Sequence, residues 1–398
     1  MREERRLPPV WLMGLTNAVF GMMGGFAVVT LPQLLAAQGV PGGSIAKMVA
    51  VVTSGPFWVA AISPMLDVRF SRRTYALALA VLTAAAAMFT MLHRTDVRAM
   101  VVVMAAGFAA AALYQGAVGG WMGSLIDKKQ DGQLGVWFAV SNIGAGGIAI
   151  ALGGELIQRA APWTAALVAG ALLLAPLLLF LFIPAPGPDR QLASESFGRF
   201  ARDIAALMKR REVVIALAMF VLPSASFALT NVLGGIGKDF AASERLVSLS
   251  AGAGGIVAGL AGSFLLALLA KWFPLRRLYL SVGVVGALFT LMLLVLPRGP
   301  AVFAVAITGE NLFQSLSFAT ANGITFETMG PGNPLAATLF TVLIAVSNLP
   351  ILYMGYIDGA AYTWHGVAGA FGVDAALGLA ACAGLMMVLR RETFERLR

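Results

Sequence analysis

The feature that most constrains this chain is a series of long apolar segments that recurs along nearly its whole length. Of its 398 residues, 59% are hydrophobic and 12% are charged, whereas soluble domains carry about 25% charged residues. A helix needs roughly 20 apolar residues to cross the hydrocarbon core of a membrane. Twelve segments meet this length, at 10–37, 42–66, 74–92, 97–126, 133–157, 162–184, 213–236, 246–271, 277–296, 300–328, 335–357 and 366–389. Only helices or closed barrels satisfy their backbone in lipid, and no alternating strand pattern is present, so the chain predicts an all-α membrane protein with twelve transmembrane helices.

The net charge of +9 comes from short basic clusters between the apolar segments. A nucleic-acid-binding protein would instead present a basic face on a soluble domain, so we expect no nucleic-acid partner. With both termini on one side of the membrane, the loops on that side hold 21 Lys and Arg residues and the opposite loops hold 7. The positive-inside rule therefore predicts that both termini are cytoplasmic, and we expect the protein in a bacterial inner (plasma) membrane.

Few residues are available for metal binding or catalysis. The single Cys382 lies in an apolar segment, and His93 and His365 fall in different loops. These residues build neither a disulfide framework, nor a zinc site, nor a His-based triad. No phosphate-binding loop of the Gly-x-x-x-x-Gly-Lys-Ser/Thr type is present, which argues against ATP drive. We expect no metal, no cofactor and no enzymatic activity.

The middle of the chain differs in character from the rest. The stretch Pro184–Arg190 breaks any helix, and apolar residues then recur at helical spacing among basic ones from Phe197 to Lys209. This pattern predicts a short amphipathic helix at the membrane interface, either a tether between two halves or a lipid-sensing element. The expected parts are an N-terminal six-helix half (1–184), a cytoplasmic linker with the amphipathic helix (185–211) and a C-terminal six-helix half (212–398).

Three short motifs of the N-terminal half recur in the same order in the C-terminal half, at offsets of 204, 199 and 206 residues. They pair Ser71-Arg72-Arg73 with Leu275-Arg276-Arg277, Leu113-Tyr114-Gln115 with Leu312-Phe313-Gln314, and Ala139-Val140-Ser141-Asn142 with Ala345-Val346-Ser347-Asn348. The common order indicates a duplication. A parallel repeat of two six-helix halves, with ligand sites near the midplane, is the architecture of major facilitator transporters.

Glu310 lies in the middle of the predicted span 300–328, where a charge costs roughly 2.5–3.5 kcal/mol. We interpret it as the only carboxylate near the middle of a span. Gln314 and Ser317 share its helix face and Asn311 borders that face, so the stripe is expected to line the bundle interior or a watery cavity. Burial favours the neutral form of a carboxyl group. Glu310 could therefore carry a proton, bind a cation or join helices by a hydrogen bond.

Other polar residues inside the predicted spans extend this set. Each one alone more often marks a helix–helix hydrogen bond than a ligand contact. Together with Glu310, Asn311 and Gln314, the candidates for binding a solute or a proton are Asn17, Tyr114, Gln115, Asn142, Asn231 and Asn348. The prolines inside the spans predict kinks, at Pro32, Pro56, Pro223 and Pro350.

The loop sequence Asp67-Val68-Arg69-Phe70-Ser71-Arg72-Arg73 resembles the cytoplasmic loop motif of the major facilitator superfamily, in which an Asp precedes a basic pair. The resemblance implies a cytoplasmic gate formed by Asp67, Arg72 and Arg73, whose ion pairs break and re-form as the protein changes conformation. In the alternative interpretation, these arginines only set the topology. The second copy, from Lys271 to Arg277, lacks the acid.

Several stretches resemble one branch of that superfamily, the peptide and acetyl-coenzyme A transporters that include AmpG-type muropeptide permeases. They are Gly25-Phe26, Leu31-Pro32, Gly39-Val40, Pro56, Ser63–Asp67, Glu310-Asn311, Ala319-Thr320-Ala321 and Ala337–Leu343. One departure is clear, because the Asp-x-x-x-Asp pair of that branch is replaced by Gln115–Gly119. Because both acids are absent, this chain either couples transport through Glu310 or works differently from that branch.

The resemblance implies a monomeric secondary active transporter that works by alternating access, with a small-molecule solute, a coupling proton and membrane lipid as its partners. The expected solute is a muropeptide-like or other polar compound taken up by symport. Two alternatives remain open from the residues. They are efflux of amphiphilic drugs or metabolites, and a membrane sensor that keeps the fold without transporting.

Overall fold

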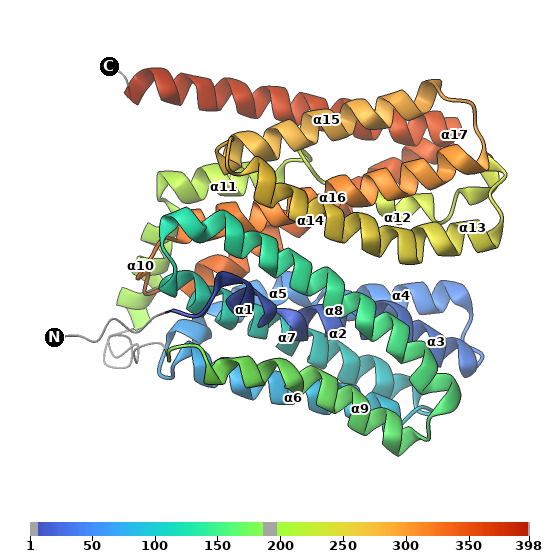
Figure 1. Ribbon diagram of the computed structural model, residues 1–398, viewed down its shortest axis with the longest axis horizontal. Coiled ribbons are helices and arrows are strands. Elements are labelled where there is room, and N and C mark those ends of the chain that lie inside the picture. The colour runs from blue at the N-terminus through green and yellow to red at the C-terminus, as the bar shows by residue number, and fades with distance from the viewer. Residues whose placement is uncertain (1–6, 186–196, 397–398) are drawn as a thin grey trace. The chain divides into compact units, whose positions relative to one another are not determined.

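The computed structural model describes residues 7–185 and 197–396, and within these ranges the regular elements are all helical (Figure 1). The basic residues Arg2, Arg5, Arg6, Arg190 and Arg398, which contributed to the predicted orientation, lie outside the described residues. By internal packing the chain divides into two compact units. One contains Met1–Met208 with Met329–Ala345, and the other contains Lys209–Thr328 with Val346–Arg398.

The first unit contains the first six predicted spans and the amphipathic helix. Its elements are α1 (Val10–Leu15), α2 (Ala18–Gly25), a π-helical stretch (Phe26–Thr30), α3 (Leu31–Ala37), α4 (Gly42–Thr53), α5 (Gly55–Ile62), 3₁₀ turns at Ser63–Asp67 and Lys128–Gln130, α6 (Arg72–Leu92), α7 (Val97–Leu125), α8 (Asp131–Arg159), α9 (Pro162–Leu174) with a 3₁₀ continuation (Ala175–Leu181), and α10 (Phe197–Met208). The start of α17 (Ala336–Arg396) also belongs to this unit.

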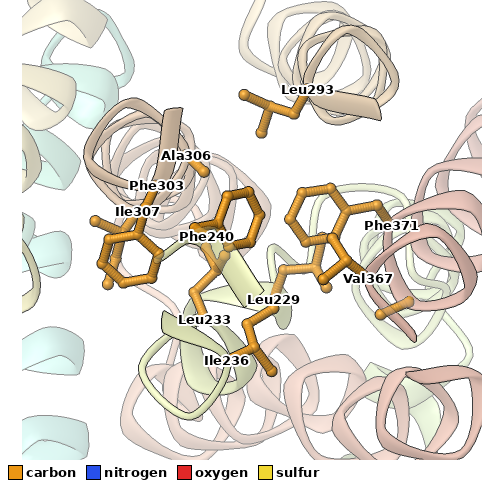
Figure 2. Close-up of a cluster of buried hydrophobic side chains, with 11 residues drawn as sticks. Leu229, Leu233, Ile236, Phe240, Leu293, Phe303, Ala306, Ile307, Val367 and Phe371 are labelled. Atoms are coloured by element: carbon orange, nitrogen blue, oxygen red, sulfur yellow. The ribbon is translucent and has the colours of Figure 1, made fainter. Parts of the chain in front are cut away.

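The second unit contains the remaining spans. Its elements are α11 (Arg211–Val221), α12 (Leu229–Leu233), a 3₁₀ turn (Gly237–Phe240), α13 (Glu244–Leu249), a π-helical stretch (Ser250–Gly254), α14 (Gly255–Leu269), α15 (Leu275–Val295), α16 (Pro300–Met329) and most of α17. A core of aliphatic and aromatic side chains from α12, α15, α16 and α17 packs inside it (Figure 2).

All twelve predicted spans are found as helical stretches. Among the described residues, nine stretches are both long and apolar enough to cross a membrane. One of the nine, Ala336–Leu389, is two spans, because His365 and Gly366 leave the helical conformation and Gly366 adopts φ 61°, which only glycine accepts without strain. A further span is α16, which carries Glu310, Asn311 and Gln314 near its middle, and the last is the interrupted pair α11 and α12.

Some of the breaks in the helices lie at prolines. Pro56 stands in the first turn of α5, where its missing N–H group costs no hydrogen bond. Pro223 lies in the non-helical segment Leu222–Ala228, which separates α11 from α12. Pro350 is accommodated inside α17. The predicted kink at Pro223 is therefore a complete interruption of one span.

Small residues let the helices of the first unit approach closely. A Cβ atom added at Gly120 of α7 would lie 2.5 Å from the backbone nitrogen of Ala337, and one added at Gly21 of α2 would lie 2.2 Å from the carbonyl oxygen of Asn142 in α8. Transmembrane helices gain van der Waals contact when small residues line their interface. The glycines thus fix which helix faces meet.

Candidate functional site

Glu310 of α16 is fully buried inside the second unit. The Thr290 hydroxyl of α15 donates a hydrogen bond of 2.6 Å to its Oε1 atom, whereas its Oε2 atom has no hydrogen-bond partner among the described residues. A charged carboxylate with one unpaired oxygen is costly in a membrane interior, so this side chain is suited to carry a proton or to face a cation.

Two further carboxyl groups are buried near Glu310, and the interpretation of Glu310 as the only mid-span carboxylate is wrong. Asp358 is fully buried and Asp374 is 9% exposed, and both belong to α17. The three groups lie within electrostatic reach of one another. Both oxygens of Asp358, and Oδ1 of Asp374, have no hydrogen-bond partner in the described structure. The sequence feature that indicates a second buried carboxyl group is Asp374, an acid inside the apolar segment 366–389.

The other polar residues of the α16 stripe hold the interruption between α11 and α12 in place. The Gln314 side-chain amide donates to the carbonyl oxygen of Phe227 (3.3 Å) and to the Thr230 hydroxyl (2.9 Å). The Ser317 hydroxyl donates to the carbonyl oxygen of Ala225 (2.8 Å). Phe227 itself adopts φ 48°. These bonds supply donors to carbonyls that lost their helical partners when the helix was broken.

The asparagine candidates of the second unit are less concentrated. Asn311 donates to the carbonyl oxygen of Ile307 one turn earlier in its own helix (2.7 Å). Asn231 of α12 is exposed, and Asn348 of α17 is half-buried. Asn311 thus uses its amide donor within its own helix.

In the first unit, the candidates Asn17 and Tyr114 stabilise a break between α1 and α2. Tyr114 is fully buried, and its hydroxyl donates to the carbonyl oxygen of Thr16 (2.6 Å). The Asn17 amide donates to the carbonyl oxygen of Phe138 in α8 (3.1 Å), and the Ser141 hydroxyl donates to the carbonyl oxygen of Leu15 (3.2 Å). Oδ1 of Asn17 has no partner in the described part of the chain. These residues thus serve the first broken helix much as Gln314 and Ser317 serve the second.

Gln115 lines a small cavity of the first unit. The cavity volume is about 10 Å³, and its walls include Gly116 of α7 and Phe340 and Thr341 of α17. This volume is close to what one water molecule requires. Asn142 of α8 contributes its backbone, not its side chain, to the close contact with Gly21.

Asp67 forms a buried cluster at the start of α17. Its Oδ1 atom accepts hydrogen bonds from Arg72 Nε (2.9 Å) and from the backbone N–H group of Ala337 (3.2 Å). Its Oδ2 atom accepts from the backbone N–H group (2.8 Å) and the hydroxyl (2.7 Å) of Thr338. Both Asp67 and Arg72 are buried, at 0% and 4% exposure. A carboxylate at a helix N-terminus satisfies unpaired N–H groups and complements the helix dipole.

Arg72 extends this contact, because its Nη2 atom donates to the carbonyl oxygens of Asn333 (3.1 Å) and Pro334 (3.0 Å). Arg73 follows in the first turn of α6 and is half-buried. In the second copy of the motif, Arg276 lies 3.9 Å from Glu327 of α16. The acid that the second loop lacks is thus supplied by another helix.

No group of three or more His, Cys, Asp or Glu side chains that could hold a metal ion occurs among residues 7–185 and 197–396. The arrangement can bind and release protons or small ions at buried carboxyl groups, and it can make or break an acid–base contact at a helix end.

Comparison with known proteins gives a family match and several similar folds. The profile of the Major Facilitator Superfamily matches residues 13–352. Among solved structures, an outward-facing bacterial homologue of the iron transporter ferroportin superposes with a TM-score of 0.72 at 15% identity, covering 95% of this chain and 98% of that one. The E. coli fucose:proton symporter superposes with a TM-score of 0.70 at 16% identity, with 95% and 98% coverage, and the human organic anion transporter MFSD10 with 0.66 at 15% identity, with 97% and 100% coverage. Comparison with curated proteins gives no match.

Proposed function

Since the chain belongs to the major facilitator superfamily, whose members are membrane transporters and not enzymes, we propose that it is a proton-coupled secondary transporter in which Glu310 carries the proton. The observation that carries this proposal is the full burial of Glu310 with one oxygen bonded to Thr290 and the other unpaired. A proton would make this side chain neutral, and deprotonation would leave a charge that the site does not balance.

The cluster around Asp67 supplies the gate of this proposal. Its hydrogen bonds to Arg72 and to the start of α17 are specific to one arrangement of these segments. A contact of this kind stabilises one conformation and breaks in the other, which is what alternating access requires. We place this cluster, and with it both termini, on the cytoplasmic side of a bacterial inner membrane, and we propose that the protein works as a monomer.

For the solute, the resemblance to the AmpG-type branch favours import of a muropeptide-like or other polar compound. The alternative, which the residues leave open, is efflux of amphiphilic drugs or metabolites. A third possibility is a membrane sensor with the same fold that binds a solute without moving it.

The test uses the purified protein in proteoliposomes with an imposed pH gradient and a radiolabelled muropeptide. We expect gradient-driven accumulation, with a loss of at least tenfold in Glu310→Gln, because the amide cannot carry the proton. Exchange of labelled for unlabelled solute without a gradient should persist in this variant. Glu155→Gln, at an exposed helix position that pairs only with Arg159, is the matched control and should transport normally.

Equal gradient-driven accumulation in Glu310→Gln and the unaltered protein would disprove the assignment of the proton to Glu310. Accumulation of amphiphilic compounds in inverted vesicles, with no muropeptide uptake, would favour efflux. Binding without flux for every solute, together with a stable partner protein in pull-downs, would favour the sensor.

A further inference from the structure

A second binding site is suggested by the cavity beside the interrupted helix of the second unit. It lies between the non-helical segment that follows α11 and the two helices α15 and α17. Its lining includes Ser224, Ser226, Thr290 and Asp374. Its volume is about 10 Å³, which corresponds to one water molecule or one small ion and is far too small for an organic solute. The occupant is therefore of ionic or water size.

The carboxylate of Asp374 is the charged group of this cavity. Asp374 is 9% exposed, and its Oδ1 atom has no hydrogen-bond partner in the described structure. An unpaired carboxylate oxygen at this depth costs free energy unless a proton or a cation compensates it. Asp374 lines the cavity, which supplies space for such a partner.

The surroundings of Asp374 are rich in negative charge. Glu310 and Asp358 are fully buried within electrostatic reach of it. No Lys, Arg or His belongs to the buried residues described in the second unit. Two other titratable residues lie in this part of the second unit. They are Cys382, which donates to the carbonyl oxygen of Ser224 (3.1 Å), and Tyr279 of α15. In ordinary surroundings both side chains are mostly uncharged at neutral pH. The interior thus favours an added positive charge.

The other oxygen atoms of the cavity that can coordinate a cation are uncharged. The Ser224 hydroxyl donates its hydrogen to the carbonyl oxygen of Met219 (3.0 Å), and the Thr290 hydroxyl donates to Glu310, so both retain lone pairs for an ion. Hydroxyl, carbonyl and carboxylate oxygens are ligands for hard cations. In broken transmembrane helices, unwound backbone segments commonly coordinate sodium ions or protons. The described residues offer one carboxylate at the cavity and no converging set of three acids or histidines, which suits a monovalent ion better than a divalent one.

Apolar residues stand near this polar region on three helices, and they belong to the core drawn in Figure 2. Leu293 stands three residues after Thr290 in α15, Ile307 three before Glu310 in α16, and Phe371 three before Asp374 in α17. A spacing of three places each of these side chains about one helical turn from its polar neighbour. All three are buried, and they pack with Leu229, Phe240 and Phe303. Exclusion of water by these side chains strengthens the attraction between the acids and a bound cation.

We propose that this cavity binds one sodium ion, with the Asp374 carboxylate as the charged ligand and the hydroxyls of Ser224, Ser226 and Thr290 as neutral ligands. The site goes beyond the proton proposed at Glu310 and does not depend on it. Thr290 links the two, because it touches Glu310 and lines the cavity.

The test is binding of ²²Na⁺ to the purified full-length protein at pH 8, together with thermal unfolding in sodium chloride, potassium chloride and choline chloride at equal ionic strength. A ligand that binds only the folded state raises the unfolding temperature. We expect one sodium ion per chain, a higher unfolding temperature in sodium than in choline, and loss of both effects in Asp374→Asn. Ser226→Ala, which removes a single hydroxyl, should weaken binding about tenfold. Glu244→Gln, at an exposed acid of the same unit, is the control that should bind normally.

The proposal is overturned if the unaltered protein binds no sodium, or if Asp374→Asn binds it as before. Should Asp374→Asn unfold readily in choline as well, Ser226→Ala decides, since unchanged sodium affinity in that variant also refutes the site. Glu310→Gln separates the two proposals. Sodium binding that persists in Glu310→Gln while proton-driven transport is lost supports both the proton at Glu310 and the sodium ion at Asp374. Proton-driven transport by a protein that binds no sodium leaves the assignment of the proton to Glu310 intact and refutes only the sodium site.

Discussion

Asp67 shows how much the surroundings of a residue determine its contribution. Its carboxylate accepts four hydrogen bonds, and two of them come from backbone N–H groups at the start of α17, 270 and 271 residues further along the chain. Removal of one partner from a buried ion pair leaves the other charge uncompensated, which commonly costs 3–5 kcal/mol. An exposed pair within one helix contributes only about 0.3–0.5 kcal/mol.

We therefore predict that Asp67→Ala lowers the free energy of unfolding by about 3–5 kcal/mol, measured by denaturant titration in detergent with tryptophan fluorescence as the signal. The matched control is Glu155→Ala, which breaks the exposed pair with Arg159 and should change stability by less than about 1 kcal/mol. Equal effects of the two substitutions would show that the cluster at α17 contributes no more than a surface ion pair.

At the same scale, the sequence predicted the burial of Glu310 but not that of Asp358. Glu310 stands out because apolar residues flank it on both sides. Asp358 lies one residue beyond the predicted span 335–357, whereas the helix continues to Trp364 and packing buries the carboxyl group. The partners of Asp67 could not be predicted either, because no local pattern indicates a contact across 270 residues. The loop motif identified the residue but not the helix end that it binds.

At the scale of elements, the two broken helices are the main departure from a simple bundle. The break between α1 and α2 receives hydrogen bonds from Tyr114 and Ser141, and the break between α11 and α12 receives them from Gln314 and Ser317. The apolar segments predicted the lengths and order of the helices, since these follow from about 20 apolar residues per span. The repeat in the sequence indicated that Tyr114-Gln115 and Phe313-Gln314 correspond, but not that their side chains support broken backbone.

The hydrogen bond from Gln314 to the broken backbone gives a prediction for two residues of α16, Gln314 and Asn311. Gln314→Leu should lower the free energy of unfolding by about 1–3 kcal/mol, because the carbonyl oxygen of Phe227 loses a donor without gaining contact with water. Asn311→Leu should have a smaller effect, since the carbonyl oxygen of Ile307 that it contacts already belongs to a helix. Denaturant titration of both variants is the measurement. A larger loss in Asn311→Leu would contradict the role assigned to Gln314.

At the scale of the whole molecule, α17 is the element that both units share. Its residues up to Ala345 belong to the first unit, together with the preceding loop from Met329, and those from Val346 onward belong to the second. The first part packs closely on α7, where a Cβ atom added at Gly116 would lie 3.3 Å from Cβ of Thr341. Alternating access by a transporter of this superfamily requires rearrangement of its helices, so a covalent bond at this contact is expected to hold the protein in one conformation.

Gly116→Cys combined with Thr341→Cys, in a Cys382→Ala background that removes the one native thiol, should form a disulfide, because the two Cβ atoms lie close to the 3.5–4.5 Å that a disulfide requires. We expect the oxidised double variant to lose at least nine-tenths of its solute exchange in proteoliposomes and to regain it after reduction, whereas each single-cysteine variant should be indifferent to oxidant. Mass spectrometry of the cross-linked peptides confirms that the bond has formed. Full exchange by a completely cross-linked protein would mean that α7 and the start of α17 stay together throughout transport, and that the Asp67 cluster is a permanent structural contact instead of a gate.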